Sequence, residues 1–162
     1  MADIYIICVE DEPQVLDVMV RDLAELEEVF PVEVASSADE ARALIKEIEE
    51  EGHKIGLALC DHIMPGDKGI DLMIEMQKDP FTQNTRKVLI TGQAGLEDTI
   101  QAVNNAKLNR YIAKPWNPAN LVEVAKDELT EYVIKEEKDL LRFMTVLDQE
   151  RLHEAIRNIG YL

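Results

Sequence analysis

The sequence has 162 residues, a formal net charge of −16 and 46% hydrophobic residues. A chain of this length can bury a core large enough to fold as one compact domain without disulfides or a structural metal. The charge arises from 33 acidic against 17 basic residues. This balance argues against binding to bare nucleic acid or to an anionic membrane surface, because phosphate contacts need clustered lysine and arginine.

The sequence also bears on the compartment in which the protein works. No apolar run approaches the ~20 residues that span a bilayer, and the first ten residues, MADIYIICVE, lack the basic leader and cleavage site of a signal peptide. Both cysteines, Cys8 and Cys60, fall inside apolar runs. We interpret them as buried core thiols rather than as a redox pair, and we expect a cytoplasmic protein.

Apolar runs alternate with segments of helical periodicity along the first 130 residues. Continuous apolar runs are typical of parallel strands that are buried on both faces. The runs predict strands at Ile4–Val9, Val32–Ala35, Ile55–Cys60, Lys87–Ile90 and Tyr111–Ala113. Apolar residues at helical spacing follow each strand, which indicates five β-α units and a parallel sheet with helices on both faces.

Local signals mark the ends of several of these helices. Ser37 with Glu40 forms a capping box, and Gly52 is placed to end the same helix in a left-handed conformation. Asn117 can cap the helix after the fifth strand, with Pro118 at its first position. The helix between the fourth and fifth strands is predicted from its apolar positions Leu96, Ile100 and Val103.

The segment after residue 130 exceeds what five β-α units require. A helical stripe with a polar break at residues 135–139 is predicted from Val133, Leu140, Met144 and Leu147. Asp148 can cap a final short helix that Gly160 ends. We therefore divide the chain into a domain of residues 1–130 and a C-terminal helical extension of residues 131–162. The stripe leaves open whether the extension packs within one chain or between two copies.

Reactive or charged side chains follow four of the predicted strands. The first strand is followed by Glu10 and Asp11, the third by Asp61, the fourth by Thr91 and the fifth by Lys114. In an open parallel α/β sheet the carboxyl ends of the strands form the binding crevice. We therefore expect these five residues, which are far apart in sequence, to converge on one spot.

Three carboxylates in such a spot repel one another unless a proton or a cation neutralises them, and a hard divalent cation does so better. Mg2+ prefers oxygen ligands and binds through one or two carboxylates plus waters and phosphate oxygens. We predict that Asp11 and Asp61 are direct ligands, together with a backbone carbonyl near Ile63. Glu10 is placed to hold a ligand water.

Lys114 and Thr91 complete a site suited to phosphoryl transfer. That reaction is catalysed mainly by positioning and by neutralising charge on the equatorial oxygens. A metal on one side and the Lys114 ammonium on the other form such a clamp. Asp61 is then the nucleophile that forms an acyl phosphate, and Thr91 donates a hydroxyl hydrogen bond to the new phosphoryl group.

Four strings resemble those of response-regulator receiver domains of two-component signalling. They are VEDE (9–12), DHIMPGDKG (61–69), TGQ (91–93) and YIAKPW (111–116), and the resemblance covers about residues 3–130. It implies a flavodoxin-like fold with strand order 2-1-3-4-5 and a chemotaxis-type receiver. It also implies that Asp61 is the phosphoacceptor, Glu10 and Asp11 the acidic pair, Thr91 the switch hydroxyl and Lys114 the essential lysine.

The resemblance further implies partners and a readout. The donor is a phosphohistidine on a sensor histidine kinase or a histidine phosphotransfer protein, and the output is a contact with a downstream protein. Tyr111 occupies the position of a switch aromatic, on a face formed by the helix after Gly95, the fifth strand and the helix after Pro118. The chain catalyses only its own phosphoryl transfer and dephosphorylation. The Lys114–Pro115 bond is often cis in this family.

Two positions bear on the lifetime of the acyl phosphate in this family. Ile63 lies two residues after Asp61, and Gln93 lies two residues after Thr91. An apolar Ile63 cannot orient an attacking water by hydrogen bonding. We therefore expect slow self-dephosphorylation.

Other interpretations remain open at this point. The chain fits the N-terminal regulatory part of a longer regulator with an enzyme output, or a homodimer joined through its C-terminal helices. A redox or nucleotide-binding α/β protein needs a glycine- or hydroxyl-rich first loop, whereas this loop reads EDEPQ. An aspartyl phosphohydrolase usually carries its nucleophile after the first strand, with a second Asp two places on. This chain has Glu10, Asp11 and Glu12 there. Tyr111 is also compatible with an ordinary half-buried strand aromatic.

Overall fold

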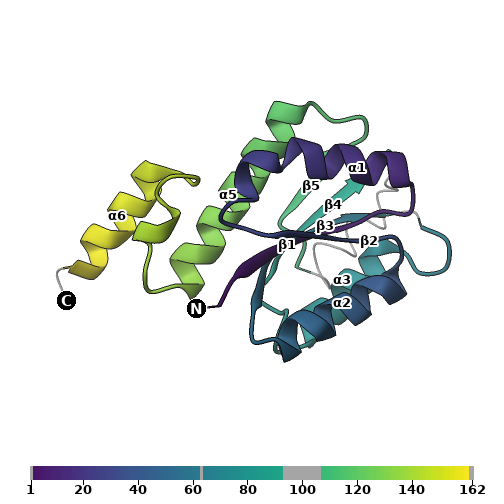
Figure 1. The fold of residues 1–162 in the computed structure, drawn as a ribbon, viewed down its shortest axis with the longest axis horizontal. Coiled ribbons are helices and arrows are strands. Elements are labelled where there is room, and N and C mark those ends of the chain that lie inside the picture. Colours follow the sequence, from purple (N-terminus) through teal and green to yellow (C-terminus); the bar gives the residue numbers. More distant parts are fainter. Residues whose placement is uncertain (1, 63, 93–106, 161–162) are drawn as a thin grey trace.

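The computed structural model describes residues 2–62, 64–92 and 107–160, which form an α/β fold around a five-stranded parallel sheet (Figure 1). The strands are β1 (Ile4–Val9), β2 (Val32–Ala35), β3 (Lys54–Asp61), β4 (Arg86–Thr91) and β5 (Arg110–Ala113). Their order is β2-β1-β3-β4-β5. The predicted fold class and strand order are therefore confirmed. β3 and β4 extend one residue further at each end than predicted, and β5 begins one residue earlier.

Helices cover both faces of the sheet. α1 (Pro13–Asp22) and α5 (Pro118–Glu136) lie on one face, and α2 (Ala38–Glu50) and α3 (Gly69–Lys78) lie on the other (Figure 1). The helix predicted from Leu96, Ile100 and Val103 lies outside the described residues.

Each face of the sheet has its own apolar cluster, because successive strand side chains point to opposite faces. Ile6 and Cys8 of β1 pack with α1 and α5, whereas Ile7 of β1 and Cys60 of β3 pack with α2 and α3. The two cysteines are buried and free. They lie on opposite faces of the sheet, so the interpretation as core thiols is confirmed.

The predicted helix caps are present, with one difference. The Ser37 hydroxyl accepts a hydrogen bond from the Glu40 N–H, but the Glu40 carboxylate accepts from the Ser36 hydroxyl instead of the Ser37 backbone. Gly52 has a φ of 81° after α2. The Asn117 side chain accepts from the N–H of Ala119 at the start of α5.

The C-terminal extension folds back on the sheet and its helices, so its apolar stripe packs within the chain. Phe143 stacks on Phe30 with ring centroids 5.6 Å apart. Leu140, Leu147 and Leu152 are buried in the same cluster as α1 and α5. The extension is therefore part of the main hydrophobic core.

The prediction of a helix through Met144 and Leu147 was wrong. α5 ends at Glu136, and a short 3-10 turn, η3 (Leu141–Phe143), precedes α6 (Gln149–Gly160). The polar residues 135–139 offer the helix no apolar face, and the Asp139 side chain accepts the Leu141 N–H in competition with helical bonding. α5 crosses residue 130, and the division of the chain there stays a prediction.

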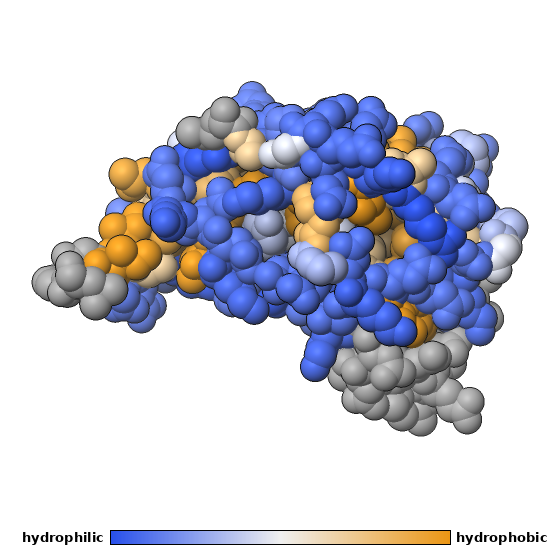
Figure 2. All heavy atoms as spheres, turned by 90° about the horizontal axis from the view of Figure 1, so that it is seen from below, coloured by the Kyte–Doolittle hydropathy of each residue, from blue (hydrophilic) through white to orange (hydrophobic). Residues whose placement is uncertain are grey.

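The surface seen in Figure 2 is mostly hydrophilic, in keeping with the net charge of −16. Apolar atoms are exposed at the end of the molecule beside the C-terminus (Figure 2), and Ile159 of α6 is half exposed. Among the described residues, no helix has the length and apolarity needed to cross a membrane.

Candidate functional site

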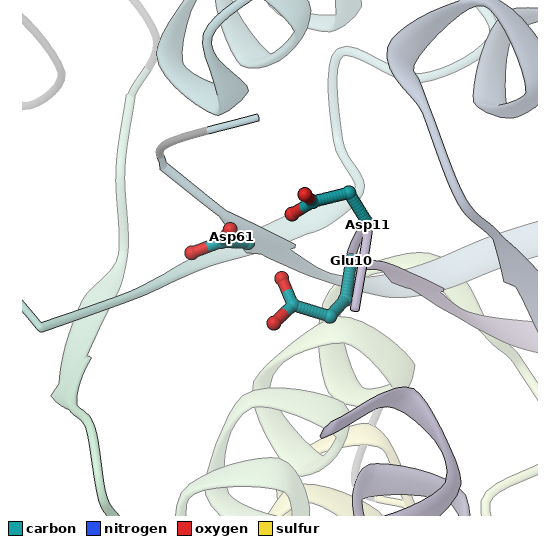
Figure 3. A group of neighbouring side chains, drawn as sticks. All are labelled: Glu10, Asp11 and Asp61. Atoms are coloured by element: carbon teal, nitrogen blue, oxygen red, sulfur yellow. The ribbon is translucent and has the colours of Figure 1, made fainter. Parts of the chain in front are cut away.

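Three carboxylates meet at the carboxyl edge of the sheet. Glu10 and Asp11 directly follow β1, and Asp61 ends β3, the neighbouring strand. Val9 pairs with Cys60 in the register of these strands, which brings the next residues side by side. One carboxylate oxygen from each acid lies within 4.8 Å of the other two, and their side chains face a common space (Figure 3). The structure thus brings together the three acids that the sequence singled out.

Lys114, which directly follows the edge strand β5, reaches these acids. Its ammonium donates to Glu10 Oε1 at 2.7 Å and lies 3.1 Å from Asp61 Oδ1. The Lys114 N–H donates to the Thr91 carbonyl at 3.0 Å, which fixes the start of its loop against the end of β4. One cation therefore bridges acids that stand on two different strands.

Burial and charge act in opposite directions on this cluster. Glu10 is fully buried, and burial together with the nearby Asp61 carboxylate raises the pKa of Glu10 to about 7, although Lys114 opposes the rise. Burial also disfavours the Lys114 ammonium, but its bonds to Glu10 and Asp61 outweigh burial and raise the pKa of Lys114. Lys114 is therefore a permanent cation at neutral pH.

Among the described residues of this cluster, carboxylates outnumber cations. Three acids face one ammonium within these contacts. The second oxygen of Glu10, Oε2, is buried and has no hydrogen-bond partner within the described part of the chain. An oxygen in this situation is well suited to a second cation or to a water that a cation holds.

The backbone around Asp61 is closely packed. The Gly69 N–H donates to the His62 carbonyl at 2.9 Å and closes the loop that follows β3. A side chain on Gly69 would overlap the Asp61 carbonyl. Thr91 is buried at the end of β4, one position beyond Ile90, the register partner of Asp61. A Cβ on the neighbouring Gly92 would meet, among the described residues, only the Lys114 Cβ at 4.0 Å.

Comparisons with known proteins agree with this geometry. The model of the response regulator receiver domain family matches residues 6–126.

This chain belongs to the response regulator receiver domain family.

Two curated relatives resemble the receiver domain described here. This chain is 35% identical over 121 residues to the hydrogenase transcriptional regulatory protein HoxA of Cupriavidus necator. The match covers 75% of this chain and 23% of HoxA. The chain is 30% identical over 122 residues to the transcriptional regulatory protein AruR of Pseudomonas aeruginosa, covering 75% of this chain and 48% of AruR. The chain thus spans about a quarter to a half of the length of these relatives.

A solved structure shows the same fold. The CheY-like receiver domain protein of Methanospirillum hungatei JF-1 aligns with a TM-score of 0.71 and 31% identity, covering 83% of this chain and 99% of that one. This likeness confirms the receiver fold.

The remaining predicted residues have different outcomes. Tyr111 is 49% exposed on β5, which is compatible with a surface aromatic, and its switch role stays a prediction. The Lys114–Pro115 bond is cis, as the resemblance implied. Ile63 and Gln93 lie outside the described residues, so the metal-ligating carbonyl and the expectation of slow dephosphorylation stay predictions.

Sequence reasoning missed two features of this site. Gly69 stands in the string DHIMPGDKG, but its close approach to Asp61 needs the fold of the intervening loop. The direct contact between Glu10 and Lys114 was also missed, since Glu10 was assigned to a ligand water. A strand-end acid next to a strand-end lysine was the available signal.

Proposed function

We propose that this receiver domain is a phosphorylation-dependent switch in which Asp61 accepts a phosphoryl group from a partner phosphohistidine. The observation that supports this most directly is the position of Lys114, whose ammonium lies 3.1 Å from Asp61 Oδ1 in a cluster of three acids. A nucleophilic carboxylate beside a fixed cation suits a reaction that is catalysed by positioning and by charge neutralisation.

The cluster fits Mg2+ as a cofactor. Its oxygens lie close enough to share one ion, and the unpartnered Glu10 Oε2 offers a place for a ligand water. Asp11 and Asp61 would hold the ion directly. When bound, Mg2+ supplies positive charge to the oxygens of the transferring phosphoryl group.

The residues of the chain account for the remaining chemistry. A carboxylate oxygen of Asp61 attacks phosphorus, the phosphorus–nitrogen bond of the phosphohistidine breaks, and its electron pair returns to the imidazole nitrogen. Lys114, which lies beside Asp61, neutralises a phosphoryl oxygen. Thr91 donates its hydroxyl to the bound group. The face that includes β5, Tyr111 and α5 then changes, as a local charge event biases a two-state element.

This function is signalling and not turnover of a separate substrate. A sensor histidine kinase or a histidine phosphotransfer protein is the proposed donor, and a downstream protein is the proposed reader. The only chemistry assigned to the chain is its own phosphorylation and dephosphorylation. Its cytoplasmic location stays a prediction.

Incubation with acetyl phosphate and Mg2+, followed by intact-mass measurement, tests the proposal. The wild-type chain is expected to gain the mass of one phosphoryl group, and Asp61→Asn to gain none. Asp17→Asn serves as the control, because Asp17 is exposed on α1. Modification of Asp61→Asn, or none of wild type, would refute the assignment.

A second possibility is that residues 1–162 form the N-terminal regulatory part of a longer regulator. The observation that favours it is the coverage of HoxA and AruR, of which this chain matches 23% and 48%. Both are named as transcriptional regulators, so any nucleic-acid contact would belong to a further segment. The full-length gene decides this point. A sizing column, run with and without phosphorylation, decides whether the C-terminal helices form a homodimer.

A further inference from the structure

Arg42 on α2 holds three acidic side chains at once. Its Nε and Nη2 atoms donate to both oxygens of Glu75 on α3, at 2.7 and 2.9 Å. The same Nη2 donates to Asp67 at 2.6 Å, and Nη1 donates to Asp39 at 2.7 Å. Planar guanidinium groups with two-pronged bonds fix direction as well as charge. Arg42 therefore joins α2 to two segments that are distant in sequence, through Asp67 and Glu75.

One of these segments follows Asp61 directly; its described residues, 62 and 64–68, are here called the acceptor loop. The Gly69 N–H donates to the His62 carbonyl at 2.9 Å and so holds the two ends of the loop together. Asp67 lies near the C-terminal end of the loop, just before α3. Gly66 turns the chain there with a φ of 88°. Through Asp67, Arg42 ties this part of the loop to α2.

We infer that the Arg42–Asp67 pair positions the acceptor loop and thereby sets the Mg2+ affinity and the phosphorylation rate of Asp61. This inference rests on the proposed function. The contacts of Arg42 described above include neither Asp61 nor the other acids of the site, so Arg42 acts as a positioning residue. Its influence runs along the chain from Asp67 to Gly69, whose N–H bonds the carbonyl of His62, the residue next to Asp61.

The size of the effect follows from the exposure of the pair. The side chains of Arg42 and Asp67 are 32% and 47% exposed, and exposed ion pairs contribute little singly. A forked network contributes more than a single pair. We therefore expect changes of about fivefold, and not the complete loss that follows from removing the acceptor.

The structure separates this role from simple helix packing. Arg42 binds Glu75 to join α2 to α3, and it binds Asp67 to hold the loop. Asp67→Ala removes only the loop contact. Glu75→Ala removes only the contact with α3 and is the matched control, since Glu75 is similarly exposed at 53%.

The experiment compares wild type, Arg42→Gln, Asp67→Ala and Glu75→Ala. Calorimetry gives the Mg2+ affinity, intact mass gives the rate of modification by acetyl phosphate, and thermal unfolding shows that each variant is folded. Arg42→Gln and Asp67→Ala are expected to bind Mg2+ about fivefold more weakly and to react about fivefold more slowly. Glu75→Ala is expected to stay within about twofold of wild type.

Two outcomes overturn the inference. In one, Asp67→Ala binds Mg2+ and reacts like wild type. In the other, Glu75→Ala loses as much as Asp67→Ala, which makes Arg42 a packing residue. A wild-type chain that neither binds Mg2+ nor gains mass refutes the proposed function itself, and the positioning role with it.

Discussion

The α-carbon of Gly69, the first residue of α3, lies against the backbone carbonyl of Asp61, the last residue of β3. The space between them excludes even one methyl group. The bond from the Gly69 N–H to the His62 carbonyl holds the two segments at this separation. The position of the proposed phosphoacceptor therefore depends on a residue eight places further along the chain.

Gly69→Ala is expected to destabilise the fold by about 1–3 kcal/mol, because the added methyl group pushes on backbone that cannot rotate away. Denaturant unfolding measures the loss, and calorimetry should show weaker Mg2+ binding. Gly92→Ala is the control for stability, since within the described part of the chain a methyl group there meets only the Lys114 Cβ, at 4.0 Å. Equal stability of Gly69→Ala and wild type would contradict the close approach.

Glu10→Gln is expected to stabilise the metal-free protein at pH 8 by about 1–3 kcal/mol. Burial raises the pKa of Glu10 to about 7, so the ionised carboxylate is unfavourable above that pH. An amide can still accept the Lys114 hydrogen bond. The same variant should gain less stability from added Mg2+ than wild type does.

Thermal unfolding with and without Mg2+ checks both parts of this prediction. Glu12→Gln removes the same charge from an exposed neighbour and should change the unfolding free energy by less than about 0.5 kcal/mol. A destabilised Glu10→Gln variant would show that the ion pair with Lys114 outweighs the burial of the charge.

Lys87 makes the stability depend on pH. It is 1% exposed, its ammonium donates to the Thr85 carbonyl and the Gln77 amide oxygen, and burial lowers its pKa from 10.5 to about 8. The unfolded chain therefore binds more protons between these two values. The unfolding free energy is therefore highest above pH 10.5. It falls as the pH is lowered from 10.5 to 8, because the unfolded chain binds the Lys87 proton more readily than the folded protein does.

The unfolding free energy of wild type relative to Lys87→Met should thus rise by about 3 kcal/mol between pH 7.5 and pH 10.5. Urea titrations of both proteins at several pH values provide the measurement. A constant difference across this range would mean that Lys87 keeps its ordinary pKa in the folded protein.

Phe143→Ala is expected to lower the unfolding free energy by about 3–5 kcal/mol, because Phe143 is fully buried and stacks on Phe30. Leu141 lies two residues earlier and is 69% exposed, so Leu141→Ala should have little effect. The two variants are compared by denaturant unfolding. Similar small losses would show that the extension does not pack on the core.

The sequence by itself determined the five strands and the residues that end them. Buried parallel strands must be apolar along their whole length, so Ile4–Val9 and the other runs stand out locally. The carboxyl ends of such strands share one edge of the sheet, and this rule alone places Asp11, Asp61 and Lys114 close together. The alternation of strands and helices predicts a parallel sheet, and the strand order came from the resemblance to the receiver family.

Only the tertiary structure decided which side chains meet. Lys114 lies 104 positions from Glu10, and Arg42 lies 25 positions from Asp67. Neither pair follows from a local pattern, because each contact depends on how whole helices and strands pack. The extension shows the same limit. Its apolar residues predicted burial, but the packing of Phe143 on Phe30 depends on how the chain after α5 folds back onto the residues before β2.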